Sequence, residues 1–155
     1  MSEQDIPTKA GSTITAQQIA EKSSALMHAT DKCAHTLGMQ ILEISPGHAA
    51  VSMTVQSEYA NGHGFCQGGI IVTLADTAFA HACNSYNQIN VTQGLSIEFV
   101  RSAKVGDQLI ATACEQSRGK HTGVYQVLVR NSDNKLVAIF SGKSFARNEP
   151  IFADD

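Results

Sequence analysis

The sequence has no run of basic residues and no apolar run of membrane-spanning length, and only 16% of its 155 residues are charged. Its net charge is −3, which argues against nucleic acid as a partner because nucleic-acid-binding domains carry basic patches. No window reaches the ~20 apolar residues of a membrane span, and the first ~25 residues are polar. We therefore expect a cytoplasmic protein with neither a membrane anchor nor a secretory signal.

Cysteine is sparse, and none of the four cysteines has the CxxC spacing of a redox or zinc motif. Cys33, Cys66, Cys83 and Cys114 are expected as reduced thiols, because disulfides belong mainly to exported proteins. The six histidines are scattered without an HxxxH or HExxH pair, so a metal site has little support. No cofactor is expected.

Length and composition predict one globular domain with a full hydrophobic core, since 43% of the residues are apolar. We expect a flexible N-terminal tail over residues 1–14, a single domain over 15–148 and a C-terminal tail over 149–155. The low charge also leaves surface that a subunit interface would cover.

One stretch, from Asn61 to Asn84, dominates the prediction. Its glycine-rich start predicts a tight loop, and its apolar, alanine-rich remainder predicts a helix over Gly69–Tyr86. This helix is apolar on nearly every side, which indicates a core helix. Asp76 is then an acid in an apolar element, where a charge is costly unless it is paired or used. We favour a functional carboxylate over one that only pairs with a loop or a distant arginine.

Shorter elements flank this helix. Thr15 and Gln18 have capping-box spacing and predict a helix to about residue 28, with Ile19, Leu26 and Met27 facing inward. Strands are predicted where apolar residues alternate, over 39–44, 49–55, 91–100, 108–116, 124–129 and 136–145. Short turns favour antiparallel neighbours, so we expect an α+β fold in which one curved antiparallel sheet wraps around the core helix.

Several stretches of the chain resemble one known family: ALMHATDKCAHTLGM at 25–39, LADTAFAHACNS at 74–85, RGKHTGVY at 118–125 and GKS at 142–144. Together with Asn61, Gly64 and Gly68 ahead of Asp76, they resemble the hotdog fold and, within it, the phenylacetate-degradation (PaaI-type) thioesterases. The resemblance implies an acyl-coenzyme A (acyl-CoA) thioesterase for aryl-acetyl thioesters such as phenylacetyl- or hydroxyphenylacetyl-CoA. It also implies active sites shared across a homodimer, and two dimers in a homotetramer.

The resemblance also implies catalytic roles for individual residues. Asp76 matches the carboxylate that acts as general base on water or as nucleophile on the thioester carbon. The backbone N–H of Gly68 matches the group that polarises the thioester oxygen. Asn61 matches a loop asparagine that orients the water or the substrate, and Thr92 falls where relatives place a hydroxyl near the attacking water.

At the start of the core helix the sequence departs from the family. Most relatives read His-Gly-Gly, and this chain reads Gln67-Gly68-Gly69. Gln67 can form hydrogen bonds but cannot carry a proton charge. A hotdog enoyl-CoA hydratase, one alternative function, wants a histidine–carboxylate pair, and Gln67 removes that histidine. A non-catalytic acyl-CoA binding module is the other alternative, and Gln67 is the one feature that favours it.

Further residues are candidates for binding the substrate. The matched RGKHTG segment implies contacts with the CoA nucleotide from Arg118, Gly119, Lys120, His121 and Thr122. Gly69 and Thr77 are placed beside the reacting group, although Thr77 could bond only to its own helix. Arg101 and Lys104 are equally consistent with phosphate binding and with ordinary charge in a turn. His63 is expected to brace the glycine loop.

The spacing of Gly68 and Asp76 indicates a site made by two subunits. A helix start offers free N–H groups and a positive dipole end for a developing oxyanion. Asp76 lies about 12 Å further along the same helix, at ~1.5 Å per residue. That is too far for its carboxylate to attack a carbonyl held at its own helix start, so the two groups of one site must come from different subunits.

Overall fold

The computed structural model describes residues 13–153, so positions 1–12 of the predicted N-terminal tail lie outside the described residues. Within this range every predicted helix and strand is present, with ends that differ by a few residues. In chain order the elements are α1 (Ala16–Thr30), α2 (Lys32–Thr36), β1 (Gln40–Ser45), β2 (His48–Thr54), the 3-10 turn η1 (Ser57–Tyr59), α3 (Gly68–Cys83), β3 (Asn90–Phe99), β4 (Gln108–Arg118), β5 (Thr122–Arg130) and β6 (Leu136–Ala146).

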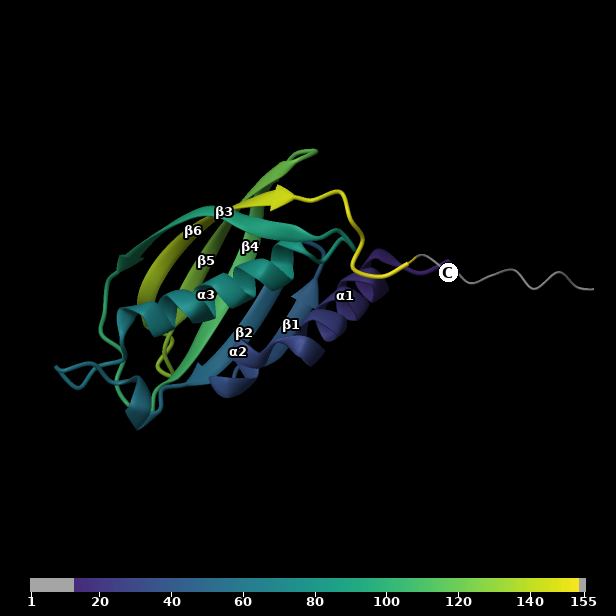
Figure 1. Ribbon diagram of the computed structural model, residues 1–155. Coiled ribbons are helices and arrows are strands. Elements are labelled where there is room, and N and C mark those ends of the chain that lie inside the picture. Colours follow the sequence, from purple (N-terminus) through teal and green to yellow (C-terminus); the bar gives the residue numbers. More distant parts are fainter. Residues whose placement is uncertain (1–12, 154–155) are drawn as a thin grey trace, which may run out of the picture.

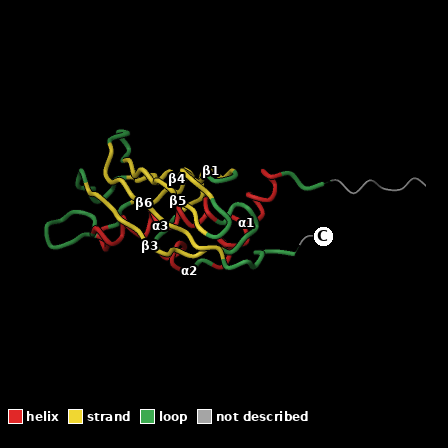
Figure 2. Tube along the Cα trace, turned by 90° about the horizontal axis from the view of Figure 1, so that it is seen from above, coloured by secondary structure: helices red, strands yellow, loops and turns green. Residues whose placement is uncertain are grey.

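The strands form one six-stranded antiparallel sheet in the order β1-β2-β4-β5-β6-β3. Figure 1 shows the sheet curving around α3, which confirms the predicted α+β hotdog arrangement. Figure 2 shows the same arrangement from above, with the connecting loops gathered at the ends of the strands. Strand β3 does not pair with β4, the next strand in the chain; it pairs with β6 and forms one edge of the sheet.

The core lies between α3 and the concave face of the sheet. The predicted inward face of the second strand is confirmed, because Ala49, Val51, Met53 and Val55 are at most 1% exposed. From α3, the Phe79 ring contributes most, with its centroid 5.4 Å from that of Tyr125 and 5.8 Å from that of Phe140. Burying such a side chain stabilises the fold by about 1.5–3 kcal/mol.

Four register shifts in the described sheet change which side chains face α3. They lie at Leu42 in β1, Gln93 in β3, Gln116 in β4 and Val137 in β6. A bulge inserts one residue, so the residues on either side of it, which would otherwise share a face, lie on opposite faces. Because of the bulge in β3, Thr92 lies on the α3 side, opposite buried Ser144. Simple alternation would place Thr92 on the outer face.

The prediction for the core helix needs correction at its end, and the N-terminal helix ends close to the predicted position. The core helix ends at Cys83 instead of Tyr86, because the Asn84 side-chain amide donates to the carbonyl of Ala80 at 2.8 Å. The N-terminal helix stops at Thr30, and Asp31 begins α2 by accepting a hydrogen bond from a backbone N–H in that helix.

The inward face of α1 also differs from the prediction. The predicted capping box at Thr15 is confirmed, but the buried residues of α1 are Ala20, Ser23 and Ser24. Leu26, expected inside, is 45% exposed. Small side chains on this face let α1 approach α3 and β1 closely.

The segment after β6 is held against the domain over part of the predicted C-terminal tail (149–155). The Asn87 side chain accepts hydrogen bonds from the N–H groups of Ile151 and Phe152 and donates to the carbonyl of Phe152, each at 3.0 Å. The Lys22 ammonium lies 4.2 Å above the centre of the Phe152 ring. Residues 154–155 lie outside the described residues.

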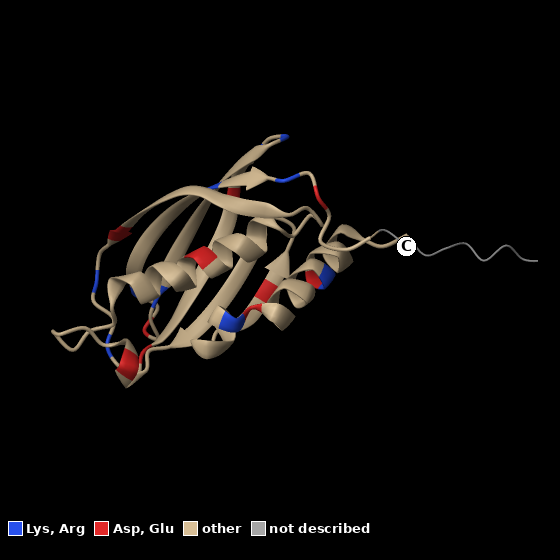
Figure 3. Cartoon of the chain, viewed as in Figure 1, with Lys and Arg blue, Asp and Glu red and all other residues tan. Residues whose placement is uncertain are grey.

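Charge is sparse in the centre of the molecule. The acidic residue of α3 is Asp76, and Figure 3 colours the acidic position on this helix red. Across residues 13–153, no helix combines the length and hydropathy needed to cross a membrane. In the same range, no three His, Cys, Asp or Glu side chains come together as metal ligands.

Candidate active site

The loop before α3 is folded by the side chain of Asn61. Its Oδ1 accepts hydrogen bonds from the N–H groups of His63 at 2.9 Å and Phe65 at 3.2 Å. Gly64 turns the chain with a φ of 80°, a left-handed conformation that glycine adopts without strain. Because Oδ1 is used within the loop, the Nδ2 amide is the group of Asn61 that can donate to a substrate.

A cavity of about 650 Å³ opens beside this loop, at the N-terminus of α3. Gly68 lines it, and a Cβ at this position would lie 3.2 Å from the Phe99 ring. The first backbone N–H groups of a helix have no partner within the helix and can bind an oxyanion. The apolar lining includes Phe65, Ile71 and Phe99, and the cationic lining residue is Arg101. The cavity therefore combines apolar walls with free backbone donors.

Asp76 lies two turns further along α3 and faces β3. Its Oδ1 accepts a hydrogen bond from Thr92 Oγ1 at 3.0 Å. Burial raises the pKa of the Asp76 carboxyl, and the Thr92 hydrogen bond opposes part of that rise. A carboxylate with a raised pKa is a better proton acceptor near neutral pH. The bulge in β3 thus brings the Thr92 hydroxyl within hydrogen-bonding distance of the Asp76 carboxylate.

A single chain does not complete the predicted site. Gly68, Val72 and Asp76 follow one another on one face of α3, at helical positions four residues apart. The cavity at Gly68 is lined by neither Asp76 nor Thr92. Within one chain the helix-start donors and the carboxylate stay about 12 Å apart.

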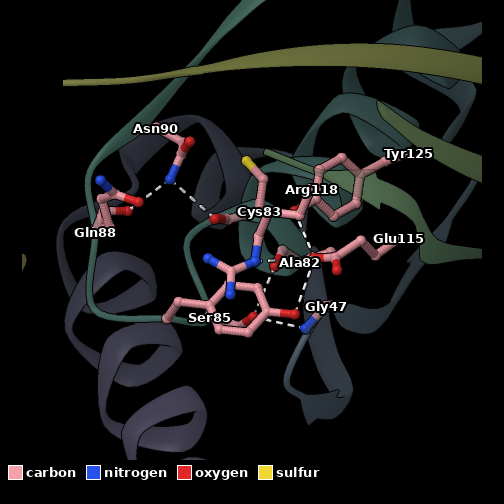
Figure 4. A network of polar contacts seen from close by, with 10 residues as sticks. Gly47, Ala82, Cys83, Ser85, Gln88, Asn90, Glu115, Arg118 and Tyr125 are labelled. Carbon is pink, nitrogen blue, oxygen red and sulfur yellow. Dashed lines mark hydrogen bonds and ion pairs between the residues drawn. The ribbon is translucent and has the colours of Figure 1, made fainter. Parts of the chain in front are cut away.

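Arg118 belongs to a polar network at the other end of the sheet (Figure 4). Its guanidinium lies 3.7 Å above the centre of the Tyr86 ring, and its Nε lies 3.8 Å from Glu115 Oε2. The same oxygen accepts hydrogen bonds from the hydroxyls of Tyr86 and Tyr125 at 2.9 Å each. Burial, together with the bonded Glu115, raises the pKa of both tyrosines. The network joins the segment after α3 to the sheet, and the Arg118 side chain stays 44% exposed.

The rest of the predicted nucleotide segment is the hairpin between β4 and β5. The N–H of Gly119 donates to the carbonyl of Thr122 at 2.8 Å, which closes the turn. Lys120 and His121 lie at its tip, and all four residues are exposed. The His121 carbonyl accepts a hydrogen bond from the last residue of β6, which fixes the hairpin beside that strand. The side chains of Lys120 and His121 are accessible to an anionic ligand.

The remaining candidates are less closely tied to the cavity. Gln67 is exposed, and its side chain makes no capping hydrogen bond. Gly69 is exposed in the first turn of α3. The Thr77 hydroxyl donates to the carbonyl of Thr73 at 2.8 Å, so it bonds within its own helix. Gln67, Gly69 and Thr77 do not line the cavity.

Sequence reasoning did not assign most of the lining residues to the site, and three of them come from two distant segments. Phe65 and His63 come from the glycine loop, and Phe99 comes from the end of β3. A second hollow of about 460 Å³ lies next to the cavity, shares Arg101 with it, and is also lined by Lys104 and Lys135. The lining residues come together because the chain crosses the sheet between β3 and β4. No local pattern in the sequence predicts that crossing.

Comparison with known proteins agrees with this architecture. The thioesterase superfamily model matches residues 63–138. The chain is 44% identical over 125 residues to the acyl-coenzyme A thioesterase PaaI of Escherichia coli K12, covering 81% of this chain and 89% of that protein. The solved structure of E. coli PaaI, described as coming from the phenylacetic acid degradation operon, matches with a TM-score of 0.87 at 40% identity, over 88% of this chain and 99% of that one.

A Streptococcus mutans UA159 protein solved with acetyl CoA bound matches with a TM-score of 0.70 at 28% identity, over 72% of this chain and 90% of that one. The E. coli relative is similar in sequence along nearly its whole length and has the same fold. This protein therefore belongs to the PaaI-type acyl-coenzyme A thioesterases of the thioesterase superfamily, and it is a thioester hydrolase.

Proposed function

We propose that this thioesterase hydrolyses aryl-acetyl-CoA thioesters, such as phenylacetyl- or hydroxyphenylacetyl-CoA, in phenylacetate catabolism. The observation that carries the proposal is the hydrogen bond between half-buried Asp76 on α3 and Thr92 on β3, on a helix whose start opens into an aromatic-walled cavity. The rings of Phe65 and Phe99 suit a planar acyl group, since aromatic pairs stack edge-on or offset. The name and operon of the E. coli relative support the same substrate class.

The residues present suit thioester hydrolysis. The thioester oxygen accepts a hydrogen bond from the Gly68 N–H, which stabilises the negative charge that develops on that oxygen. Asp76 either removes a proton from an attacking water or attacks the thioester carbon itself. In the first route the water oxygen bonds to the carbon, the carbon–sulfur bond breaks, and the CoA sulfur takes up the proton that Asp76 removed. In the second route the same bond breaks and leaves a mixed anhydride on Asp76, which a water then hydrolyses to the free acid and the restored carboxylate. In the first route Thr92 holds the Asp76 carboxylate in place while Asn61 Nδ2 donates to the water or the substrate.

A homodimer would bring these groups together. Strand β3 is a long edge strand, and its Leu95 and Phe99 are 45% and 50% exposed. Exposed apolar edge strands are normally covered, because their free backbone groups pair with another chain. If two copies pair through β3, their α3 helices run antiparallel, and a two-fold axis near Val72 would set Asp76 of one chain against the helix start of the other.

In this proposal the phosphates of the CoA nucleotide bind at the β4–β5 hairpin. Lys120 and His121 are exposed at the hairpin tip, and the Tyr86–Glu115 pair holds the Arg118 guanidinium. Guanidinium and ammonium groups bind phosphate through charge-assisted hydrogen bonds. The acetyl CoA bound to the S. mutans protein supports CoA as the ligand class. We propose further that two dimers form a tetramer and that the enzyme works in the cytoplasm.

The hydratase alternative gains no support from the site. Thr92 is the hydrogen-bond partner of Asp76, and no histidine among residues 13–153 bonds to that carboxylate. The exposed Gln67 does not supply the missing imidazole. Within one chain, Asp76 is therefore paired with a hydroxyl and not with the histidine that a hydratase wants.

Thiol release tests the proposal across a panel of phenylacetyl-, hydroxyphenylacetyl-, benzoyl- and short and long fatty acyl-CoA. Asp76→Asn should lower turnover by roughly 10²–10⁴, because it removes the general base or nucleophile. Glu149→Gln, which removes an exposed carboxylate from the segment after β6, is the matched control and should leave turnover unchanged. Faster release from fatty acyl-CoA than from aryl-acetyl-CoA would contradict the substrate assignment. Tight binding without any release would favour the binding-module alternative.

A further inference from the structure

A second group of reactive side chains lies on the outer face of the sheet, away from α3. His48 on β2 and Cys114 on β4 are directly opposed in the register of these strands. Leu109, Ala111 and Ala113 of β4 are buried against α3, so Cys114, one residue on, faces outward and is exposed. The thiol is therefore accessible from the side of the sheet opposite the thioesterase cavity.

Three side chains from adjacent strands form a hydrogen-bonded chain there. Cys114 Sγ lies 3.5 Å from His48 Nδ1, and His48 Nε2 lies 3.3 Å from Glu43 Oε2. The bulge at Leu42 turns Glu43 to the outer face, since without it Glu43 would share the inner face with Ile41. The imidazole uses its two nitrogens on opposite sides, so the group is a proton relay and not a set of ligands around one point.

This order of groups is the arrangement that activates a nucleophile. A base accepts the proton of the thiol, and a third group orients the base and stabilises it when it is protonated. The neighbours of Cys114 across the sheet are Gln126 on β5 and then Ser141 on β6, which carry no charge. Glu43 is therefore the charged group that acts on the pair.

We propose that Cys114 is a thiol-modification site that exchanges with small, unhindered disulfides. His48 Nδ1 accepts the Cys114 proton, and the thiolate attacks one sulfur of the disulfide in line with its S–S bond. The new bond joins Cys114 Sγ to that sulfur, the old S–S bond breaks, and the leaving thiolate takes the proton from His48. The products are one mixed disulfide and one free thiol, with the added disulfide as the oxidant.

Cys33 provides a control within the same chain. It is also exposed, and its thiol has no hydrogen-bond partner among the described residues. Intact protein is treated with 2-hydroxyethyl disulfide, a neutral probe, and modification of each cysteine is followed by peptide mapping. Because His48 takes up the thiol proton during the attack and Cys33 has no such base within residues 13–153, Cys114 should react roughly fivefold faster than Cys33 at pH 6.5.

Variants of the relay separate activation from simple exposure. His48→Gln should reduce the Cys114 rate to that of Cys33, and Glu43→Gln should give an intermediate rate, with the Cys33 rate unchanged in both. Rescue of the Cys114 rate in His48→Gln by added imidazole would support the role of His48 as base. Equal rates for Cys114 and Cys33, slower reaction of Cys114, or a Cys114 rate unaffected by His48→Gln would overturn the proposal.

Discussion

Mild acid should weaken the fold through His81, a buried histidine on α3 that contacts α1. Its ring is 1% exposed, and its Nδ1 lies 2.8 Å from Ser24 Oγ. Its Nε2 has no hydrogen-bond partner among the described residues. Burial and the nearby His28 lower the pKa of His81 from 6.5 to about 4, and Asp31 opposes part of this shift.

The sign and size of the effect follow from this shift. Between pH 6.5 and about 4, the unfolded chain protonates His81 and the folded chain does not. The stability contributed by the neutral, buried ring is present above pH 6.5 and is lost as the pH falls through this window. The loss is about 2 kcal/mol at pH 5 and about 3 kcal/mol when complete.

Urea unfolding at one protein concentration measures this loss at pH 7.5, 6 and 5. His81→Gln removes the titration, and His63→Gln, at an exposed loop histidine, is the matched control. Asp76 acts in the opposite direction, because burial raises its pKa and favours its protonated form in the folded state. Since Asp76 is present in all three proteins, the difference between them isolates His81. A stability difference between wild type and His81→Gln that stays constant with pH would refute the reasoning.

Two further changes test the site and the core. Thr92→Val removes a hydrogen bond that lowers the pKa of Asp76, so the acid limb of kcat/KM should move to higher pH, by roughly one pH unit for each ~1.4 kcal/mol that the bond contributes. Thr92→Ser should retain the wild-type profile, and an unshifted profile in Thr92→Val would contradict the role of the hydroxyl. Gly142→Ala would place a Cβ 2.8 Å from the Phe140 ring and 3.1 Å from the Phe79 ring, both fully buried. Urea denaturation should show that overpacking lowers the free energy of unfolding by about 1–3 kcal/mol. An unchanged free energy of unfolding would mean that the two rings move aside without cost and would contradict the prediction.

The sequence predicts the elements of this fold well, because each has a strong local pattern. Alternation locates β2 with its inward side chains, and the apolar run locates α3 with Asp76 in its middle. That the Gly68 N–H and the Asp76 carboxylate of one chain are too far apart to act on the same thioester follows from helix geometry alone.

The contacts that the sequence does not predict depend on bulges and strand order, which leave no local pattern in the sequence. The bulge at Gln93 turns Thr92 toward Asp76, and the bulge at Gln116 turns Arg118 toward the α3 side, where it meets Tyr86. Simple alternation puts both side chains on the wrong face. The crossing of the chain after β3 brings Phe99 to Gly68, and this long-range contact follows from strand order alone.

The central claim, that each site takes its carboxylate from one subunit and its helix start from the other, has a direct test. Asp76→Asn disables the carboxylate half, and Asn61→Ala disables the loop that forms the other half. Each variant alone should be nearly inactive. Co-refolded in equal amounts, they should recover about a quarter of wild-type activity, because half of the dimers are mixed and one of their two sites is intact. Activity no greater than the average of the two separate variants would contradict the shared site.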